Sequence, residues 1–412
     1  MALTLQGIFQ QHFFRYAQTR KLPLRIWKAA NAILHCRTPV LGGHVQQCPN
    51  GHLQRIQYHS CRHRSCAQCS RLPRAQWAEQ QAARLLGCDH YHVVFTLPHE
   101  LLALWEWNRA AMARALFASA RDTLMTLLAD PRFLGATPGI VMALHTWGRT
   151  LNHHPHVHAL VSGGGLTAGG DWKAVTNGHL LPVRVVKALF RGKLLAAIEQ
   201  GLRAKTLNLP APTATLAFAR TLQTLYKKNW NVCLKERYPH GQGVMKYLSG
   251  YVKGGPLGDT RLRAADDAAV AFAYRDHRDG RPKTLRLPTG DFLSRLLWHV
   301  PPPRQHTIRH YGLYSAQSAP KRARARMLLG QSATERHDPA WQQALTRLGH
   351  ADRARCPRCG NRLVRGERLA RVRAGDENSI FKTVPAGLPN KGAQADPMMS
   401  GALFLCRGGQ LS

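Results

Sequence analysis

Residues 153–161 have the sequence HHPHVHALV. Its apolar residues, Val157 among them, are typical of a β-strand. Side chains of a strand alternate between the two faces of a sheet, so His156 and His158 point to one face and Val157 to the other. Two imidazoles at this spacing can bind one divalent metal ion, which can polarise a phosphodiester. The stretch therefore predicts a metal-bearing strand.

A bare His-x-His pair is a weak motif, because histidine-rich surface loops contain it too. The strand context favours the metal site, and the glycines at residues 163–165 are expected to end the strand. The sequence does not single out a third ligand. His92, His145 and His154 are all candidates.

The charge balance points to a polyanionic partner. The chain has 412 residues, with 58 Lys and Arg against 22 Asp and Glu, a formal net charge of +36. Phosphate neutralisation by such a chain gives affinity for nucleic acid and argues against a small neutral substrate. A membrane surface is disfavoured, because we find no basic amphipathic helix, no lipidation signal and no apolar stretch long enough to span a bilayer. With no secretory signal, we expect a cytoplasmic protein.

Two tyrosines lie four residues apart in YLSGYVK, residues 247–253. A short helix over residues 242–252 would place Tyr247 and Tyr251 on one face. A tyrosine hydroxyl needs a metal-neutralised phosphate before it can attack phosphorus, and Lys246 and Lys253 can hold the DNA backbone. Alone, such a pair is more often half-buried packing. Together with the histidine strand and the charge, it indicates a nucleophile.

Cysteines crowd a Cys- and His-rich segment that runs from Cys36 to Cys69. In a reducing compartment such crowding indicates metal binding rather than disulfides. The segment offers more ligands than one tetrahedral zinc ion needs. Cys66 and Cys69 form a strong pair at its end, and either His52 or Cys61 completes the ligand set. The candidate zinc ligands are Cys48, His52, Cys61, Cys66 and Cys69. A structural zinc there would hold a DNA-contacting module that carries Arg62 and Arg64.

A further pair, Cys356 and Cys359, has the spacing of half a zinc knuckle, and the sequence reveals no second half. From about Leu369 the chain loses periodicity and is rich in Gly, Pro and polar residues, which predicts disorder. Elsewhere the patterns predict helices and strands in alternation. The expected helices are 5–34 with a break near Pro23, 72–86, 100–128 and 183–204, and the expected strands are 91–97, 139–147, 155–161 and 229–234.

Several segments, in this order, resemble transposases of the insertion sequence 91 type, which are HUH endonucleases. The segments are LGGHV (41–45), SCRHRSCAQC (60–69), YHVVFTLPHE (91–100), HHPHVHALVSGGG (153–165) and YLSGYVK (247–253). The resemblance covers roughly residues 1 to 330. One departure is Gly51, which stands where relatives commonly have the second cysteine of a Cys-x2-Cys pair.

The resemblance implies an α+β fold. A helical, zinc-binding, DNA-contacting domain would occupy residues 1–88. An HUH nuclease domain with a central antiparallel sheet and flanking helices would occupy 89–330, and a C-terminal region with the half knuckle and a disordered tail 331–412. His156 and His158 match the metal histidines, with Mg²⁺ or Mn²⁺ as the ion. Tyr247 and Tyr251 match the nucleophile segment, and Tyr251 matches the tyrosine retained in single-tyrosine relatives.

The implied activity is that of a bacterial, nucleoid-associated transposase. It would cut and rejoin single-stranded DNA at element ends and targets through a 5′-phosphotyrosine, as in rolling-circle transposition. Two alternatives remain open at this point. One is a non-catalytic zinc-dependent DNA-binding regulator, and the other is a plasmid relaxase or replication initiator with the same chemistry. The oligomeric state does not follow from the sequence.

Overall fold

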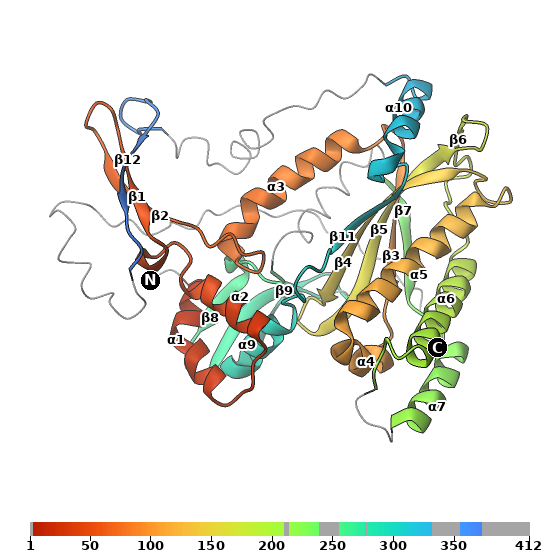
Figure 1. Cartoon of the computed structure of the whole chain (residues 1–412), viewed down its shortest axis with the longest axis horizontal. Helices are drawn as coiled ribbons and strands as arrows, with labels where there is room; N and C mark the ends of the chain where they lie inside the picture. The colour runs from red at the N-terminus through yellow and green to blue at the C-terminus, as the bar shows by residue number, and fades with distance from the viewer. Residues whose placement is uncertain (1–2, 210–213, 239–254, 277, 332–354, 373–412) are drawn as a thin grey trace.

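A computed structural model describes residues 3–209, 214–238, 255–276, 278–331 and 355–372. Its centre is a six-stranded antiparallel sheet in the order β11-β4-β5-β3-β7, with β6 added at the end of β5 (Figure 1). The strands are β3 (His90–Thr96), β4 (Thr137–Trp147), β5 (His153–Leu166), β6 (Trp172–Ala174), β7 (Val232–Tyr238) and β11 (Ile308–Gly312). The predicted α+β class and central antiparallel sheet are confirmed.

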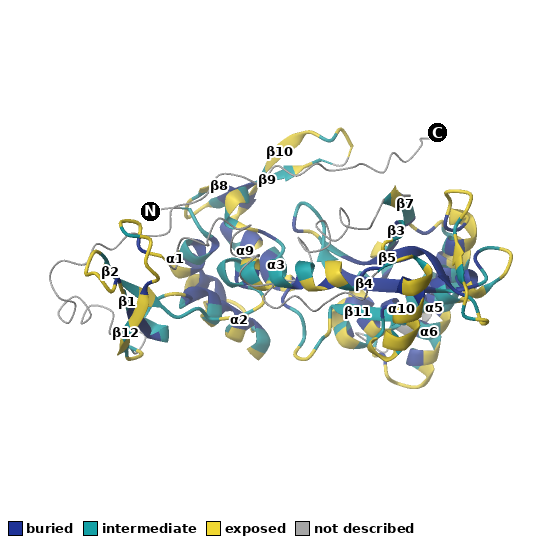
Figure 2. Cartoon of the chain, turned by 90° about the horizontal axis from the view of Figure 1, so that it is seen from above, coloured by how far each residue is buried: buried dark blue, intermediate teal, exposed yellow. Residues whose placement is uncertain are grey.

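Helices cover one face of this sheet (Figure 2). They are α4 (Leu102–Trp107), α5 (Arg109–Ala129), α6 (Val183–Arg203) and α7 (Ala214–Lys227). Alternate strand residues such as Phe95 and Val157 enter the core beneath them, and the Phe95 ring lies 4.8 Å from that of Phe190 on α6. Because every second residue is committed to this core, the intervening residues of β3, β4 and β5 face the opposite side.

The expected single helix over residues 100–128 is broken at Asn108. The Asn108 side chain donates to the Asn208 carbonyl at 2.8 Å and accepts from the Asn208 amide at 2.8 Å. Asparagine competes with the helical backbone for hydrogen bonds in this way. The break therefore comes from a tertiary contact that helical periodicity does not encode.

A second core joins the N-terminal helices to a later segment of the chain. Thr4 caps the first helix by accepting a hydrogen bond from the Gly7 amide at 3.0 Å, and Pro23 separates the two helices as predicted. The elements of this unit are α1 (Leu5–Gln18), α2 (Leu24–Leu34), β8 (Leu262–Ala265), β9 (Ala269–Arg275), β10 (Pro282–Pro288) and α9 (Thr289–Trp298). Residues expected within the nuclease domain thus pack on the N-terminal helices, and the proposed domain limits stay a prediction.

The third sheet joins two strands from an early part of the chain to its last described strand (Figure 1). Its order is β12-β1-β2, formed by β1 (Gly43–Gln47), β2 (Gln54–Tyr58) and β12 (Val364–Leu369). The helix α3 (Ala67–Arg84) follows β2, and α10 (Ala319–Leu328) carries the basic stretch that precedes residue 332. No helix in the described ranges has both the length and the apolar character needed to cross a membrane. The predicted disordered tail falls almost wholly at residues 373–412, outside the described chain.

Candidate active site and metal centres

Three histidines converge on the sheet face opposite α4–α7, where α3 and α10 also pack through Trp77 and Ala325. His156 and His158 lie on the same face of β5, as strand alternation predicts. His145 on β4 is paired directly opposite His156 and therefore shares that face. One ring nitrogen from each of the three lies within 4.8 Å of the others. Of the three candidates for a third ligand, the structure brings His145 into the group.

The other two candidates contact the two predicted ligands instead. His156 donates from Nδ1 to the His154 carbonyl at 2.6 Å. His92 on β3 places its Nε2 atom 2.8 Å from Nδ1 of His158. When the Nδ1–H group of His158 donates this hydrogen bond, the Nε2 atom of His158 keeps its lone pair. Hydrogen bonds of this kind fix the tautomer and ring orientation of metal-binding histidines. His92 and the His154 backbone therefore orient the two predicted ligands.

Burial keeps these imidazoles neutral. It lowers the pKa of His156 to about 3, with a smaller contribution from His154. It lowers the pKa of His92 to about 3 as well, assisted by the positive charge of Lys235 on β7. The pKa values of His145 and His158 are also held well below the ordinary range by burial and by neighbouring imidazoles. A neutral imidazole has the lone pair that a metal ion requires, so protons do not compete for the site at neutral pH.

The donor set favours one class of ion. Imidazole nitrogen suits divalent transition metals, whereas Mg²⁺ prefers oxygen ligands. The group contains three histidines and no carboxylate within the described residues. The residues therefore fit Mn²⁺ better than Mg²⁺.

Four cysteines form a separate group between α2 and α3. The Cys69 sulfur lies 3.3 Å from that of Cys36 and 3.5 Å from that of Cys61. Cys66 completes the set, and all four sulfur atoms lie within 4.8 Å of one another. A tetrahedral zinc ion with Zn–S distances of about 2.3 Å requires sulfur–sulfur separations of roughly 3.8 Å, close to those observed.

Two family models match the chain. A model described as "Transposase zinc-binding domain" matches residues 8–97, and one described as "Putative transposase" matches residues 139–322. The protein named "Putative transposase y4qJ" of Sinorhizobium fredii is 40% identical over 79% of this chain and 84% of its own length. The chain belongs to the insertion sequence 91 family of transposases. The "Transposase for insertion sequence element IS801" of Pseudomonas savastanoi pv. phaseolicola is 32% identical over 81% of each chain. No solved structure matches the chain.

Membership of the family gives the four-cysteine group its role. It lies within the matched zinc-binding domain, so the transposase carries a structural zinc site at Cys36, Cys61, Cys66 and Cys69. Cys36 was not among the ligands expected from the sequence, although it opens the Cys- and His-rich segment. It follows α2 directly, and the fold of the two N-terminal helices brings it to Cys69.

The expected single zinc set is divided in the structure. Cys48 and His52 lie away from the four-cysteine group and come together with Cys356 and Cys359. The sequence reveals no second half for the pair Cys356 and Cys359. In the structure Cys48 and His52 provide that second half, from more than 300 residues earlier in the chain. The four-cysteine group keeps three of the expected ligands and gains Cys36.

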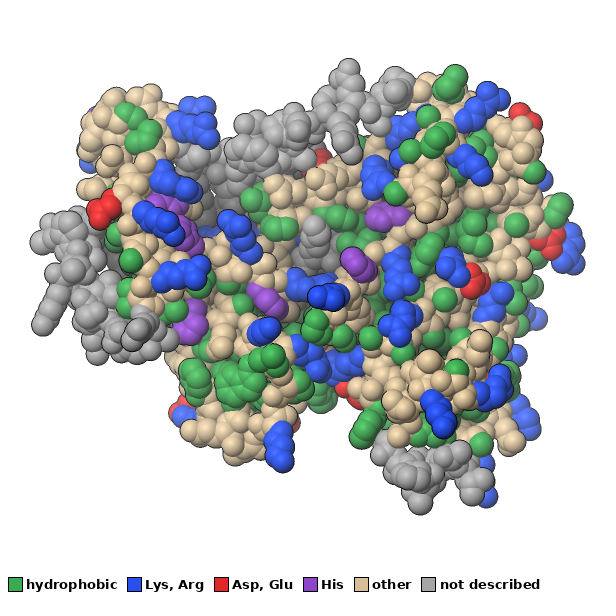
Figure 3. Space-filling view, in the orientation of Figure 1, with side chains coloured by type: hydrophobic (Ala, Val, Ile, Leu, Met, Phe, Trp, Pro, Cys, Tyr) green, Lys and Arg blue, Asp and Glu red, His purple; other side chains and the backbone are tan. Residues whose placement is uncertain are grey.

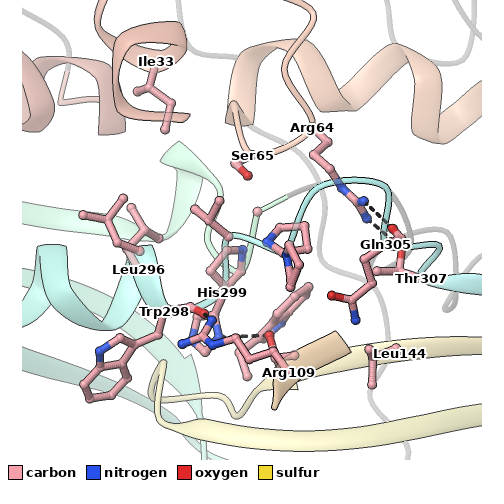
Figure 4. A pocket seen from close by; sticks show the side chains of 18 of the residues that line it. Ile33, Arg64, Ser65, Arg109, Leu144, Leu296, Trp298, His299, Gln305 and Thr307 are labelled. Atoms are coloured by element: carbon pink, nitrogen blue, oxygen red, sulfur yellow. Dashed lines mark hydrogen bonds between the residues drawn. The ribbon is translucent and has the colours of Figure 1, made fainter. Parts of the chain in front are cut away.

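The two arginines expected to contact DNA have different surroundings. Arg62 is exposed and has a φ of 55°. Arg64 donates to the Gln305 carbonyl at 3.1 Å and to the Thr307 hydroxyl at 2.7 Å, at the edge of a pocket (Figure 4). Arg109, Trp298 and His299 are among the other residues that line this pocket. Arg64 therefore tethers the zinc module to the loop before β11, and a DNA contact by either arginine stays a prediction.

The expected nucleophiles lie outside the described residues. Tyr247, Tyr251, Lys246 and Lys253 all fall within residues 239–254. One cation that the sequence did not single out is described: Lys235 on β7, close enough to depress the pKa of His92 and His158. Lys235 lies just beyond the predicted strand at 229–234, which in the structure is β7 and continues to Tyr238.

Proposed function

We propose that this transposase nicks and rejoins single-stranded DNA by tyrosine attack at a metal site formed by His145, His156 and His158. The observation that carries the proposal is the convergence of three buried, neutral imidazoles on one sheet face. The net charge of +36 supports a DNA substrate. Lys and Arg side chains are spread over the visible surface, where acidic side chains are few (Figure 3). DNA of element ends and targets in the bacterial nucleoid is the proposed substrate.

The residues have distinct roles in this scheme. His145, His156 and His158 would hold the divalent ion through their ring nitrogens. When bound, the ion neutralises charge on the scissile phosphate. His92 and the His154 carbonyl keep the ligand rings in place, and Lys235 adds positive charge beside them.

Tyr251, or Tyr247, attacks phosphorus through its phenolic oxygen. The tyrosine gives up its phenolic proton to solvent as the new bond joins it to the 5′ phosphate. The bond to the 3′ oxygen breaks, and that oxygen takes up a proton to become a 3′ hydroxyl. Attack of a 3′ hydroxyl on the phosphotyrosine reverses these changes and rejoins a strand. Each transfer exchanges one phosphodiester for another, so no external energy source is needed.

The described chain stops at Tyr238 and resumes at Gly255. β7 ends at Tyr238, which pairs with His90 at one end of β3. Gly255 lies against the Ser65 carbonyl, and both residues line a pocket together with Trp147. Trp147 stacks on His145 at 5.3 Å. Gly255 and Trp147, the residue that stacks on His145, therefore line the same pocket.

A covalent adduct is the decisive test. Purified transposase is incubated with 3′-labelled single-stranded element ends and Mn²⁺, and the label is followed on a denaturing gel. We expect an adduct that is lost in the Tyr247→Phe/Tyr251→Phe double variant, in His156→Ala and with chelator. Tyr226→Phe, on the exposed surface of α7, is the matched control and should retain it. An adduct that survives in the double tyrosine variant would exclude both nucleophiles.

A further inference from the structure

Four metal-binding side chains meet at the far end of the molecule from the histidine face. They are Cys48 and His52, between β1 and β2, and Cys356 and Cys359, just before β12 (Figure 1). The Cys48 sulfur lies 3.5 Å from that of Cys359 and 4.0 Å from Nδ1 of His52. All four ligand atoms lie within 4.8 Å of one another, although the two pairs are separated by more than 300 residues.

The backbone turns in a similar way at both pairs. Each begins with Cys-Pro and turns back on itself through a glycine in the left-handed region. The Gly51 amide donates to the Cys48 carbonyl at 2.9 Å, and Gly51 has a φ of 71°. The Gly360 amide donates to the Cys356 carbonyl at 2.9 Å, and Gly360 also has a φ of 71°. Two such turns above a short antiparallel sheet are the arrangement by which zinc ribbons present four ligands.

Apolar packing around the group is too small to hold the C-terminal segment. The hydrophobic cluster there consists of three buried residues, Cys48, Cys356 and Leu363, with Leu53 and Cys359 at its edge. Four of the six residues of β12 are exposed and none is buried. A sheet with so little core ordinarily depends on a disulfide or a metal ion. The sulfur–sulfur distance of 3.5 Å is far longer than a disulfide bond, which leaves a metal ion.

We propose that Cys48, His52, Cys356 and Cys359 bind a second zinc ion, which fastens the C-terminal strand β12 to the N-terminal zinc module. A set of three sulfurs and one imidazole nitrogen in a tetrahedral group selects zinc among the common divalent ions. Neither family model covers the whole site, because Cys356 and Cys359 follow residue 322. Binding releases the thiol protons to solvent, and its free energy becomes folding free energy for residues 355–372.

This ion would also explain why the chain departs from the Cys-x2-Cys spacing at Gly51. The left-handed turn at that position places His52, one residue later, beside Cys48. Nothing lies within 4 Å of a Cβ built at Gly51, so the glycine is required by its backbone conformation rather than by crowding. The first knuckle therefore supplies a histidine where a second cysteine would otherwise stand.

Zinc stoichiometry tests the proposal. Zinc released from the full-length transposase by a mercurial, which displaces thiolate-bound metal, is counted with a colorimetric chelator. We expect two ions per chain for the wild type and one for the Cys356→Ser/Cys359→Ser double variant. Cys88→Ser, at a free cysteine outside both groups, is the matched control and should release two. A wild-type chain that releases one ion, or a double variant that still releases two, would overturn the proposal.

A second variant keeps the test decisive if the double variant misfolds. His52→Cys should retain two ions but convert the second site from three sulfurs and one nitrogen to four sulfurs. After cobalt substitution, its near-ultraviolet spectrum should gain thiolate-to-metal charge-transfer absorption relative to the wild type. Limited proteolysis should also cut residues 355–372 in the double variant while β3–β5 stay protected. An unchanged cobalt spectrum in His52→Cys would exclude His52 as a ligand.

Discussion

The histidines of one sheet face divide into proposed metal ligands and residues that orient them, and their hydrogen bonds distinguish the two roles. His145 and His156 face each other across the β4–β5 pair, whereas His92 is hydrogen-bonded to Nδ1 of His158. All were candidates in the sequence, where strand parity places them on one face but gives no ring orientation. A prediction about metal affinity separates the two roles.

Replacing His92 by phenylalanine should weaken Mn²⁺ binding about ten- to a hundredfold, the usual effect of losing a hydrogen bond that orients a ligand. His145→Ala removes a proposed ligand and should weaken binding more. Mn²⁺ titration followed by electron paramagnetic resonance measures both. His310→Gln, on the same sheet face but bonded to Gln81, should bind as the wild type does. Wild-type affinity in His145→Ala would place the third ligand elsewhere.

Strand β5 runs through three glycines that were expected to end it. The glycines at 163–165 were expected to end the strand, and this was wrong, because β5 continues to Leu166. A Cβ at Gly164 would lie 2.4 Å from the Trp172 ring, and one at Gly165 would lie 2.4 Å from the Thr137 carbonyl oxygen. Here glycine permits close approach of neighbouring strands rather than a turn.

Gly165→Ala should therefore destabilise the transposase by about 1–3 kcal/mol, because the obstructing atom belongs to the β4 backbone and cannot rotate away. Gly192→Ala is the matched control. It lies within α6, and a methyl group added there would meet nothing within 4 Å, so the substitution should stabilise the helix by about 0.5–1 kcal/mol. Thermal unfolding of the two variants should shift in opposite directions. A Gly165→Ala protein as stable as the wild type would show that β4 and β5 can separate without cost.

Pairings between distant elements were the part that the sequence could not supply. Local periodicity predicted α1, α2, α6, β3, β4 and the alternation of β5, because each depends on residues close in the chain. It could not predict that β12 pairs with β1, or that Cys36 joins Cys69, because those contacts are set by how whole elements pack. The Tyr247 and Tyr251 assignment depends on resemblance and remains a prediction.

The whole molecule combines strong positive charge with many buried histidines. Burial lowers the pKa of His90 to about 4, of His299 to about 3 and of His310 to about 4, from an ordinary value of 6.5. His90 is held by the Tyr314 hydroxyl at 2.6 Å and the Cys88 carbonyl at 2.9 Å. Each of these rings is neutral in the folded chain at a pH where the unfolded chain is protonated. The unfolded state therefore binds more protons between about pH 6.5 and pH 4.

Stability should accordingly be fully present above pH 6.5 and fall as the pH drops toward 4. Each such histidine contributes up to about 1.4 kcal/mol per pH unit within that window. The melting temperature, measured at steps from pH 7.5 to pH 4.5, should fall less steeply for His90→Gln than for the wild type, because one protonating group is gone. Metal release at acid pH affects both proteins alike, so the difference between their slopes isolates His90. Parallel pH profiles for the two proteins would mean that His90 is protonated to the same extent in the folded and unfolded chains.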